Sequence, residues 1–217
     1  MPARLLEVAL FFVCLSAIAS ARTAAAQTDV AANAYWTFSG ATTGNNISQT
    51  SNYTVGVMLE LRHVARPLVG YEATYSFHRD SLSYVSTVIP AATALVTADV
   101  HEFAGDWVFA MKSGDLRPFG VVGAGVIADA PTSATYSPCG ITPAPHCNLV
   151  LNPPTNTSAR PVFVYGGGID CALSTHVGMR IQYRGNLARA AELTSLIRST
   201  GVFTHTAEPM FGAYFRF

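Results

Sequence analysis

The last nine residues of the chain, 209–217, alternate in character and end on an aromatic residue. Successive side chains of a β-strand point to opposite faces, so Phe211, Phe215 and Phe217 would share one face, and Tyr214 and Arg216 the other. The termini of water-soluble domains usually fray, and such an apolar strand is a rare ending for them. This ending is typical of the closing strand of a membrane β-barrel, whose apolar face lies against lipid.

The amino terminus has the layout of a secretory signal peptide. Arg4 precedes an apolar run over residues 5–19, and small residues then offer cleavage after Ala21 or after Ala26. The run is too short for a membrane-spanning helix, and an uncleaved amino-terminal anchor is the alternative interpretation. The sequence therefore predicts a signal peptide over residues 1–26 and one exported domain over residues 27–217.

The composition favours a membrane protein built from strands. Charged residues make up 12% of the chain and hydrophobic residues 50%, and that charged share is about half the usual one. The 13 basic and 13 acidic residues balance, which argues against nucleic acid as a partner. No segment after the signal reaches the apolar length of a transmembrane helix, so low charge points to strands that bury one face in lipid.

The rest of the chain divides into eight segments of strand length that alternate with a period of two. They cover residues 33–40, 53–63, 68–78, 100–112, 118–128, 161–172, 176–187 and 203–217.

The links between these segments alternate strictly between long and short. The short links are residues 64–66, 113–117 and 173–175, and the long ones are 41–52, 79–99, 129–160 and 188–202. This order predicts an all-β, eight-stranded antiparallel up-and-down transmembrane barrel with short periplasmic turns and long extracellular loops. Within the last loop, residues 188–199 could form a short helical stretch.

The polar faces of the predicted strands carry charges of both signs. Charges away from water need partners, so we expect these to pair inside the barrel. The interior of an eight-stranded barrel is only wide enough to be filled by side chains. We therefore expect a filled lumen, not an open channel. The predicted charge network comprises Glu60, Arg62, Glu72, Glu102, Asp106, Asp170, Arg180, Arg184, Glu208 and Arg216.

Three cysteines follow the predicted signal peptide. Cys139 and Cys147 lie in a Pro-rich segment, and secretion permits a disulfide between them, so we expect them to staple an outer loop. Cys171 is expected to be unpaired on a strand. A zinc site that uses Cys139, His146 and Cys147 is the alternative, but it lacks a fourth ligand at usable spacing.

Residues 122–128 have the glycine spacing of a dinucleotide-binding fingerprint. That fingerprint works only where a strand turns into a helix, whose first amides hold the pyrophosphate. A Pro-rich loop follows here instead, so we expect no cofactor.

The histidines suggest catalysis only weakly. His205 lies near the outer end of the closing strand, where some outer-membrane lipid deacylases have a His with a nearby Ser and an orienting carboxylate. Thr206 and Ala207 follow it here, so the nucleophile–base arrangement is incomplete. His78 with Asp80, and His101 with Asp99, are pairs of a kind common at barrel rims. We expect no enzymatic activity.

Several stretches resemble strands of the outer membrane protein β-barrel domain family, which includes small OmpA-like and opacity-type barrels. These are residues 100–107, 116–125, 166–170, 177–184 and 214–217, and the resemblance covers the mature chain nearly end to end. It implies a place in the bacterial outer membrane, among lipid and lipopolysaccharide. It also implies that the barrel assembly machinery reads the terminal strand, with Phe215 and Phe217.

The expected role is structural, or interaction with an extracellular ligand through the outer loops. A narrow porin-like pore for small solutes and a lipid-modifying enzyme are the alternative functions. A soluble periplasmic barrel of lipocalin type is the alternative fold, although outward apolar faces argue against it.

Overall fold

The structure is a computed structural model that describes residues 27–65, 68–86, 92–111, 115–137, 155–196 and 198–217. The predicted signal peptide and the predicted pair Cys139 and Cys147, with His146, lie outside the described residues. The strands are β1 (Gln27–Ser39), β2 (Thr42–Gly44), β3 (Ile47–Ser51), β4 (Thr54–Val64), β5 (Val69–Ser86), β6 (Thr93–Ala110), β7 (Leu116–Ser137), β8 (Ser158–Ala172), β9 (Val177–Arg189) and β10 (Phe203–Arg216).

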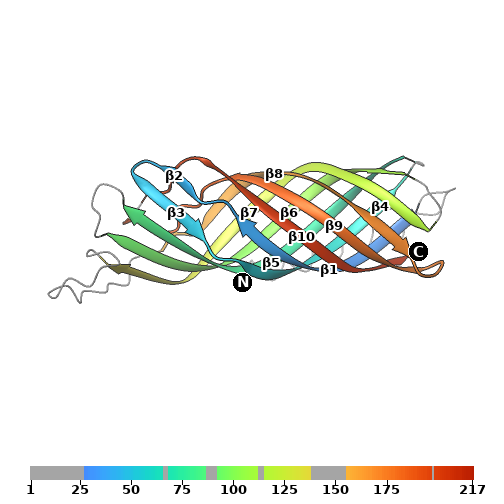
Figure 1. Cartoon of the computed structure of the whole chain (residues 1–217), viewed down its shortest axis with the longest axis horizontal. Helices are drawn as coiled ribbons and strands as arrows, with labels where there is room; N and C mark the ends of the chain where they lie inside the picture. Colours follow the sequence, from blue (N-terminus) through green and yellow to red (C-terminus); the bar gives the residue numbers. More distant parts are fainter. Residues whose placement is uncertain (1–26, 66–67, 87–91, 112–114, 138–154, 197) are drawn as a thin grey trace, which may run out of the picture.

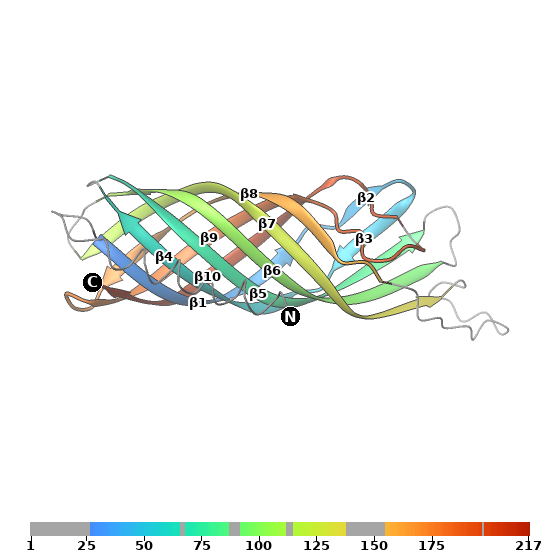
Figure 2. The same cartoon turned by 180° about the vertical axis from the view of Figure 1, so that it is seen from behind.

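Eight of these strands close into an antiparallel barrel. Strands β4 to β10 pair in chain order, and β1 pairs with both β4 and β10. At this seam Asp29 lies between Arg62 of β4 and Arg216 of β10. Figures 1 and 2 show the tilted strands from opposite sides. The predicted eight-stranded up-and-down barrel is confirmed.

Alternation along each strand separates the two faces of the barrel wall. On β4, Val55, Val57 and Leu59 are each more than half exposed on the outside, whereas Met58 and Glu60 are buried inside. This is the apolar-out pattern of a barrel in lipid. Within the described part of the chain, no helix is long and apolar enough to cross a membrane.

The strands extend further than the sequence patterns predicted at one end of the barrel. Residues 79–86, 93–99 and 129–137, assigned to long loops, belong to β5, β6 and β7. The assignment was wrong because serine and threonine alternate with apolar residues there, so one face is polar but carries few charged residues. These residues continue the hydrogen-bonded ladder, for example between Leu82 and Val96.

The expected loop 41–52 contains the hairpin β2–β3. Asn45 and Asn46 connect its strands with positive φ angles of 50° and 60°, the conformation of a two-residue type I′ hairpin turn. Strand β3 then pairs with the outer part of β5, where Ile47 lies opposite Ser86.

The helical stretch expected over residues 188–199 is wrong. Beyond Arg189, where β9 ends, the described residues of this loop are irregular. Ala191 and Leu193 are buried against Tyr84 and Val96, and the Tyr84 hydroxyl donates a hydrogen bond of 3.0 Å to the Ala191 carbonyl. Packing against the sheet overrides the helical preference of alanine here.

Together these extensions form an outer sheet, which we define as β2, β3 and residues 79–86, 93–99 and 130–137 of β5, β6 and β7. It projects at the left end of Figure 1, opposite the C-terminus. Its inner face is an apolar core covered by the segment 190–194. This core contains Ile47, Leu82, Tyr84, Ala94, Val96, Ala98, Ala191 and Leu193.

Candidate functional site

Two clusters of ion pairs occupy the barrel interior. The first surrounds Arg180, which is fully buried. Its Nε lies 2.7 Å from Asp170 Oδ1 and its Nη2 lies 3.1 Å from Asp29 Oδ1. Its Nη1 contacts Glu60. Arg62 joins the cluster because it also contacts Asp170, at 3.5 Å.

Arg62 has a second carboxylate partner and an aromatic one. Its Nη2 lies 2.7 Å from Glu72 Oε2, and its guanidinium carbon lies 4.0 Å from the centre of the Phe119 ring. The charge is thus held by a carboxylate on one side and by a ring face on the other.

The second cluster surrounds Arg184, nearer the outer sheet. Arg184 donates to Asp106 Oδ2 and to Glu102 Oε1, both at 3.0 Å. A third hydrogen bond of 3.1 Å reaches Thr74 Oγ1. The other oxygen of Glu102 accepts a hydrogen bond of 2.8 Å from Asn186 Nδ2.

All ten residues of the predicted charge network lie inside the barrel, and each is 8% exposed or less. The clusters bring eight of them together. Arg216 lies against the Tyr214 ring, 5.0 Å from its centre. Glu208 lies beside the second cluster and makes no salt bridge with any described residue.

Five further charged residues of the interior were missed from the sequence. Asp29 precedes the first predicted strand, and Asp80, Arg117, Asp129 and Arg160 fall in segments assigned to links between strands. Arg160 Nη2 lies 3.0 Å from Asp129 Oδ1, and Ser51 Oγ donates to both carboxylate oxygens of Asp80 at 2.7 Å. Extending the two-residue alternation of each predicted strand beyond its ends would have placed these residues on the inward face.

Three histidines are hydrogen-bonded to tyrosines. His205 Nε2 is hydrogen-bonded to the Tyr165 hydroxyl at 2.8 Å. His78 and His101 make similar bonds of 2.9 Å to Tyr35 and Tyr75.

The residues considered as catalytic partners are engaged elsewhere. Thr206 is hydrogen-bonded to Ser39 at 2.8 Å, so that hydroxyl does not face His205. Asp99, two residues before His101 in the sequence, accepts a hydrogen bond of 2.7 Å from Arg79. Among the described residues no group of three or more His, Cys, Asp or Glu could hold a metal ion.

The glycine motif at 122–128 lies within β7, between β6 and β8. A Cβ at Gly123 would overlap the backbone carbonyl of Gly105 and the Asp106 side chain, and one at Gly125 would overlap the Phe103 carbonyl. These glycines allow close strand packing, and the strand–turn–helix context of a dinucleotide site is absent from this described stretch.

The outer face of the outer sheet is lined with hydroxyl groups. Its cross-strand rows include Ser81, Thr97 and Ser133, and the Ser81 and Thr97 hydroxyls are 3.2 Å apart. The whole set comprises Thr43, Ser48, Thr50, Ser81, Ser83, Thr93, Thr97, Ser133, Thr135 and Ser137.

Two apolar residues and one ion pair interrupt or border this face. Val85 and Leu95 lie among the hydroxyls, and the pair Arg79–Asp99 lies at its inner margin. The Arg79 guanidinium, through its hydrogen bonds, lowers the pKa of Asp99 from its usual value.

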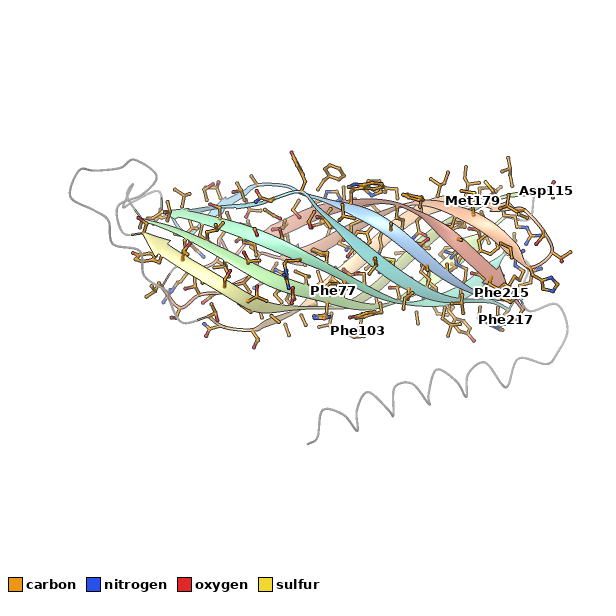
Figure 3. The ribbon with its side chains drawn as sticks, turned by 90° about the horizontal axis from the view of Figure 1, so that it is seen from below. Phe77, Phe103, Asp115, Met179, Phe215 and Phe217 are labelled. Carbon is orange, nitrogen blue, oxygen red and sulfur yellow. The ribbon has the colours of Figure 1, made fainter. Side chains whose placement is uncertain are left out.

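Apolar side chains cover the outside of the barrel. Figure 3 labels Phe77 and Phe103 along it, and Phe215 and Phe217 at the end that holds the C-terminus. Phe215 is 47% and Phe217 is 62% exposed. The Phe217 amide donates to the Thr28 carbonyl at 2.9 Å, which ties the terminus to β1. Cys171 on β8 has a free thiol, as expected.

The family model of the outer membrane protein beta-barrel domain matches residues 8–208. The chain belongs to this family. The resemblance noted from the sequence is therefore confirmed, and the protein is located in the bacterial outer membrane. No curated protein matches the chain.

Several solved outer-membrane barrels are similar in fold. OprG of Pseudomonas aeruginosa is 10% identical, with a TM-score of 0.53, over 89% of this chain and 96% of that one. Neisserial surface protein A is 12% identical, with a TM-score of 0.50, over 89% and 100%. Ail of Yersinia pestis, solved with the heparin analogue sucrose octasulfate, is 12% identical with a TM-score of 0.48, over 89% and 100%. At these identities the likeness is one of fold alone.

Proposed function

We propose that this protein is a non-enzymatic outer-membrane barrel with a filled lumen that contacts a polar partner outside the cell through its outer sheet. The observation that carries the proposal is the hydroxyl-lined outer face of that sheet. A row such as Ser81, Thr97 and Ser133 offers donors and acceptors on a rigid, nearly uncharged surface. Such a surface suits hydrogen bonding to a polar ligand more than charge steering.

The interior supports a role at the surface more than a role in transport. Arg180 bridges carboxylates of β1, β4 and β8, and Arg184 on β9 reaches across the interior to two carboxylates of β6. The segment with Ala191 and Leu193 covers the inner face of the outer sheet. A solute would have to break these buried pairs, which is costly. A narrow pore is the second candidate, and bilayer conductance separates the two.

Absence of enzymatic activity belongs to the same proposal. His205 is hydrogen-bonded to Tyr165, and no hydrogen bond joins it to a serine or a carboxylate among the described residues, as a nucleophile–base arrangement would require. Replacement of His205 tests this directly, as described below.

A surface-binding assay tests the proposed contact. Cells that display the wild-type protein would be compared with cells that display Thr97→Lys with Ser133→Lys on surfaces coated with polysaccharides or with extracellular proteins. The lysines project from the centre of the hydroxyl face and should abolish any binding that the wild type gains over empty cells. Ser174→Lys, in the turn at the opposite end, is the matched control. Equal binding by the double variant and the wild type would contradict the proposal.

The proposed partners inside the envelope are lipid and lipopolysaccharide around the apolar exterior, and the barrel assembly machinery during biogenesis. Phe215 and Phe217 support the second, since both rings are exposed at the end of the closing strand. Deletion of Phe217 should lower the amount of folded barrel in the membrane. The control is Phe109→Ala, which removes another exposed aromatic ring that is not at the end of the chain.

Two proposals concern segments outside the described residues. Cleavage of a signal peptide after Ala21 or Ala26 is checked by sequencing the amino terminus of the membrane-bound protein. A disulfide between Cys139 and Cys147 is checked by mass spectrometry of a protease digest with and without reduction.

A further inference from the structure

A cavity lies inside the barrel between the second cluster and the inner face of the outer sheet. It leaves about 60 Å³ for the centres of water molecules, which is room for a few waters or for one small ion. Glu102, Asn186 and Glu208 lie on the side of the second cluster, and Gln49, Leu82 and Ala191 on the side of the outer sheet.

The cavity carries an excess of negative charge. Around it, the carboxylates of Asp80, Glu102, Asp129 and Glu208 line the wall, and Asp106 shares Arg184 with Glu102. Against these five carboxylates, the described residues place two guanidinium groups that pair with them, those of Arg160 and Arg184. Arg189 also borders the cavity but is exposed, so the carboxylates remain in excess.

The other half of the interior shows that this excess is local. There the numbers of acidic and basic side chains are equal. The acids are Asp29, Glu60, Glu72 and Asp170, and the bases are Arg62, Arg117, Arg180 and Arg216. Since buried charges need partners, the outer half is the part of the interior that lacks cations.

The buried atoms of the cavity wall that lack a hydrogen-bond partner also favour a cation. Four oxygens have no hydrogen-bond partner: Gln49 Oε1, Asp129 Oδ2, Asn186 Oδ1 and Glu208 Oε2. Each of these four residues is 5% exposed or less. Among the described lining residues, Arg160 Nε is the only buried side-chain donor without a hydrogen-bond partner. A ligand that satisfies this wall must therefore be mainly a donor of hydrogen bonds.

The chemistry of these oxygens selects the kind of cation. No three acidic, His or Cys side chains among the described residues converge as metal ligands require. Oxygens on separate strands, some from amides and some from carboxylates, suit a cation that donates N–H bonds in several directions. We propose that this cavity binds one small ammonium-type cation, such as ammonium or a primary methylamine, held by Glu208, Asp129 and Gln49.

Direct binding of radiolabelled methylammonium tests the proposal on the full barrel, extracted in detergent, by equilibrium dialysis. We expect saturable binding of one cation per chain. Ammonium chloride should displace it, whereas tetramethylammonium chloride at the same ionic strength should not, because that ion has no N–H group. Glu208→Gln removes a charge-assisted bond and should weaken binding roughly tenfold or more.

Two further variants keep the test independent of folding. Gln49→Met removes one acceptor near the outer sheet and retains the shape of the side chain, and it should weaken binding several-fold. Asp115→Asn removes a carboxylate at the opposite end of the barrel (Figure 3) and should leave binding unchanged. Heat-modifiable mobility on a gel confirms that each variant is folded.

Three results would overturn the proposal. They are binding that does not saturate, equal displacement by tetramethylammonium, and wild-type affinity in folded Glu208→Gln or Gln49→Met.

Discussion

Arg180 on β9 and Asp170 on β8 lie directly opposite each other and form two parallel hydrogen bonds, 2.7 Å from Nε to Oδ1 and 3.0 Å from Nη2 to Oδ2. The same guanidinium contacts Glu60 on β4 and Asp29 on β1. One arginine therefore compensates carboxylates from three other strands, across the full width of the interior.

Arg180→Met should destabilise the barrel by about 3–5 kcal/mol, because it leaves buried carboxylates without their cation. Urea unfolding in lipid vesicles, followed by gel mobility, measures this free energy. Arg189→Met removes an exposed arginine at the end of the same strand and should cost far less. A similar loss in both variants would show that the buried contacts of Arg180 are not what stabilises the fold.

Gly56 and Gly105 should respond differently to the same substitution. A Cβ at Gly56 would overlap the Tyr35 ring inside the barrel, whereas one at Gly105 meets nothing within 4 Å. Overpacking of this kind typically costs about 1–3 kcal/mol. Gly56→Ala should therefore lower the unfolding midpoint in urea and Gly105→Ala should leave it nearly unchanged. A larger loss of stability in Gly105→Ala than in Gly56→Ala would show that the Tyr35 ring does not pack against Gly56.

The outer sheet should be accessible from outside intact cells. In a background with the native cysteines replaced, Ser133→Cys should react with a membrane-impermeant maleimide on whole cells. Ser174→Cys, in a turn at the other end, should react only after the outer membrane is permeabilised. Labelling of Ser174→Cys alone on intact cells would invert the assigned orientation.

His205→Ala should leave the lipid A profile unchanged when the variant and the wild type are compared by mass spectrometry. The imidazole is hydrogen-bonded to the Tyr165 hydroxyl and stacks on that ring, 6.0 Å between centres. Tyr165→Phe is a useful companion because it removes only the hydroxyl. A change in lipid A that appears with His205→Ala and not with Tyr165→Phe would reveal catalysis by this histidine.

The membrane-facing part of the fold could be predicted from the sequence because strongly apolar residues alternate there with charged or amide residues. On β9, for example, Met179 and Ile181 alternate with Arg180 and Gln182, so both the strand and its orientation are evident. The inward direction of the charged residues follows from the same pattern. Side chains of a barrel strand point either to lipid or to the interior, and the apolar set faces the lipid.

The outer sheet was missed because the polar and apolar positions of its strands differ little in hydrophobicity. Along residues 79–86 and 93–99, hydroxyl side chains such as Ser83 and Thr97 face water and resemble loop residues in composition. Which carboxylate each arginine meets could not be predicted either. Arg180 and Glu60 are 120 residues apart in sequence, and their contact depends on the closure of the whole barrel.

The proposal of a filled lumen is tested most directly by conductance in a planar bilayer. Purified, folded protein should insert without producing discrete current steps, because the clusters around Arg180 and Arg184 occupy the interior. Insertion is verified in the same preparation by heat-modifiable mobility and by protection of the barrel from protease. Reproducible steps of ohmic conductance from the wild-type protein would contradict the filled lumen and favour a pore.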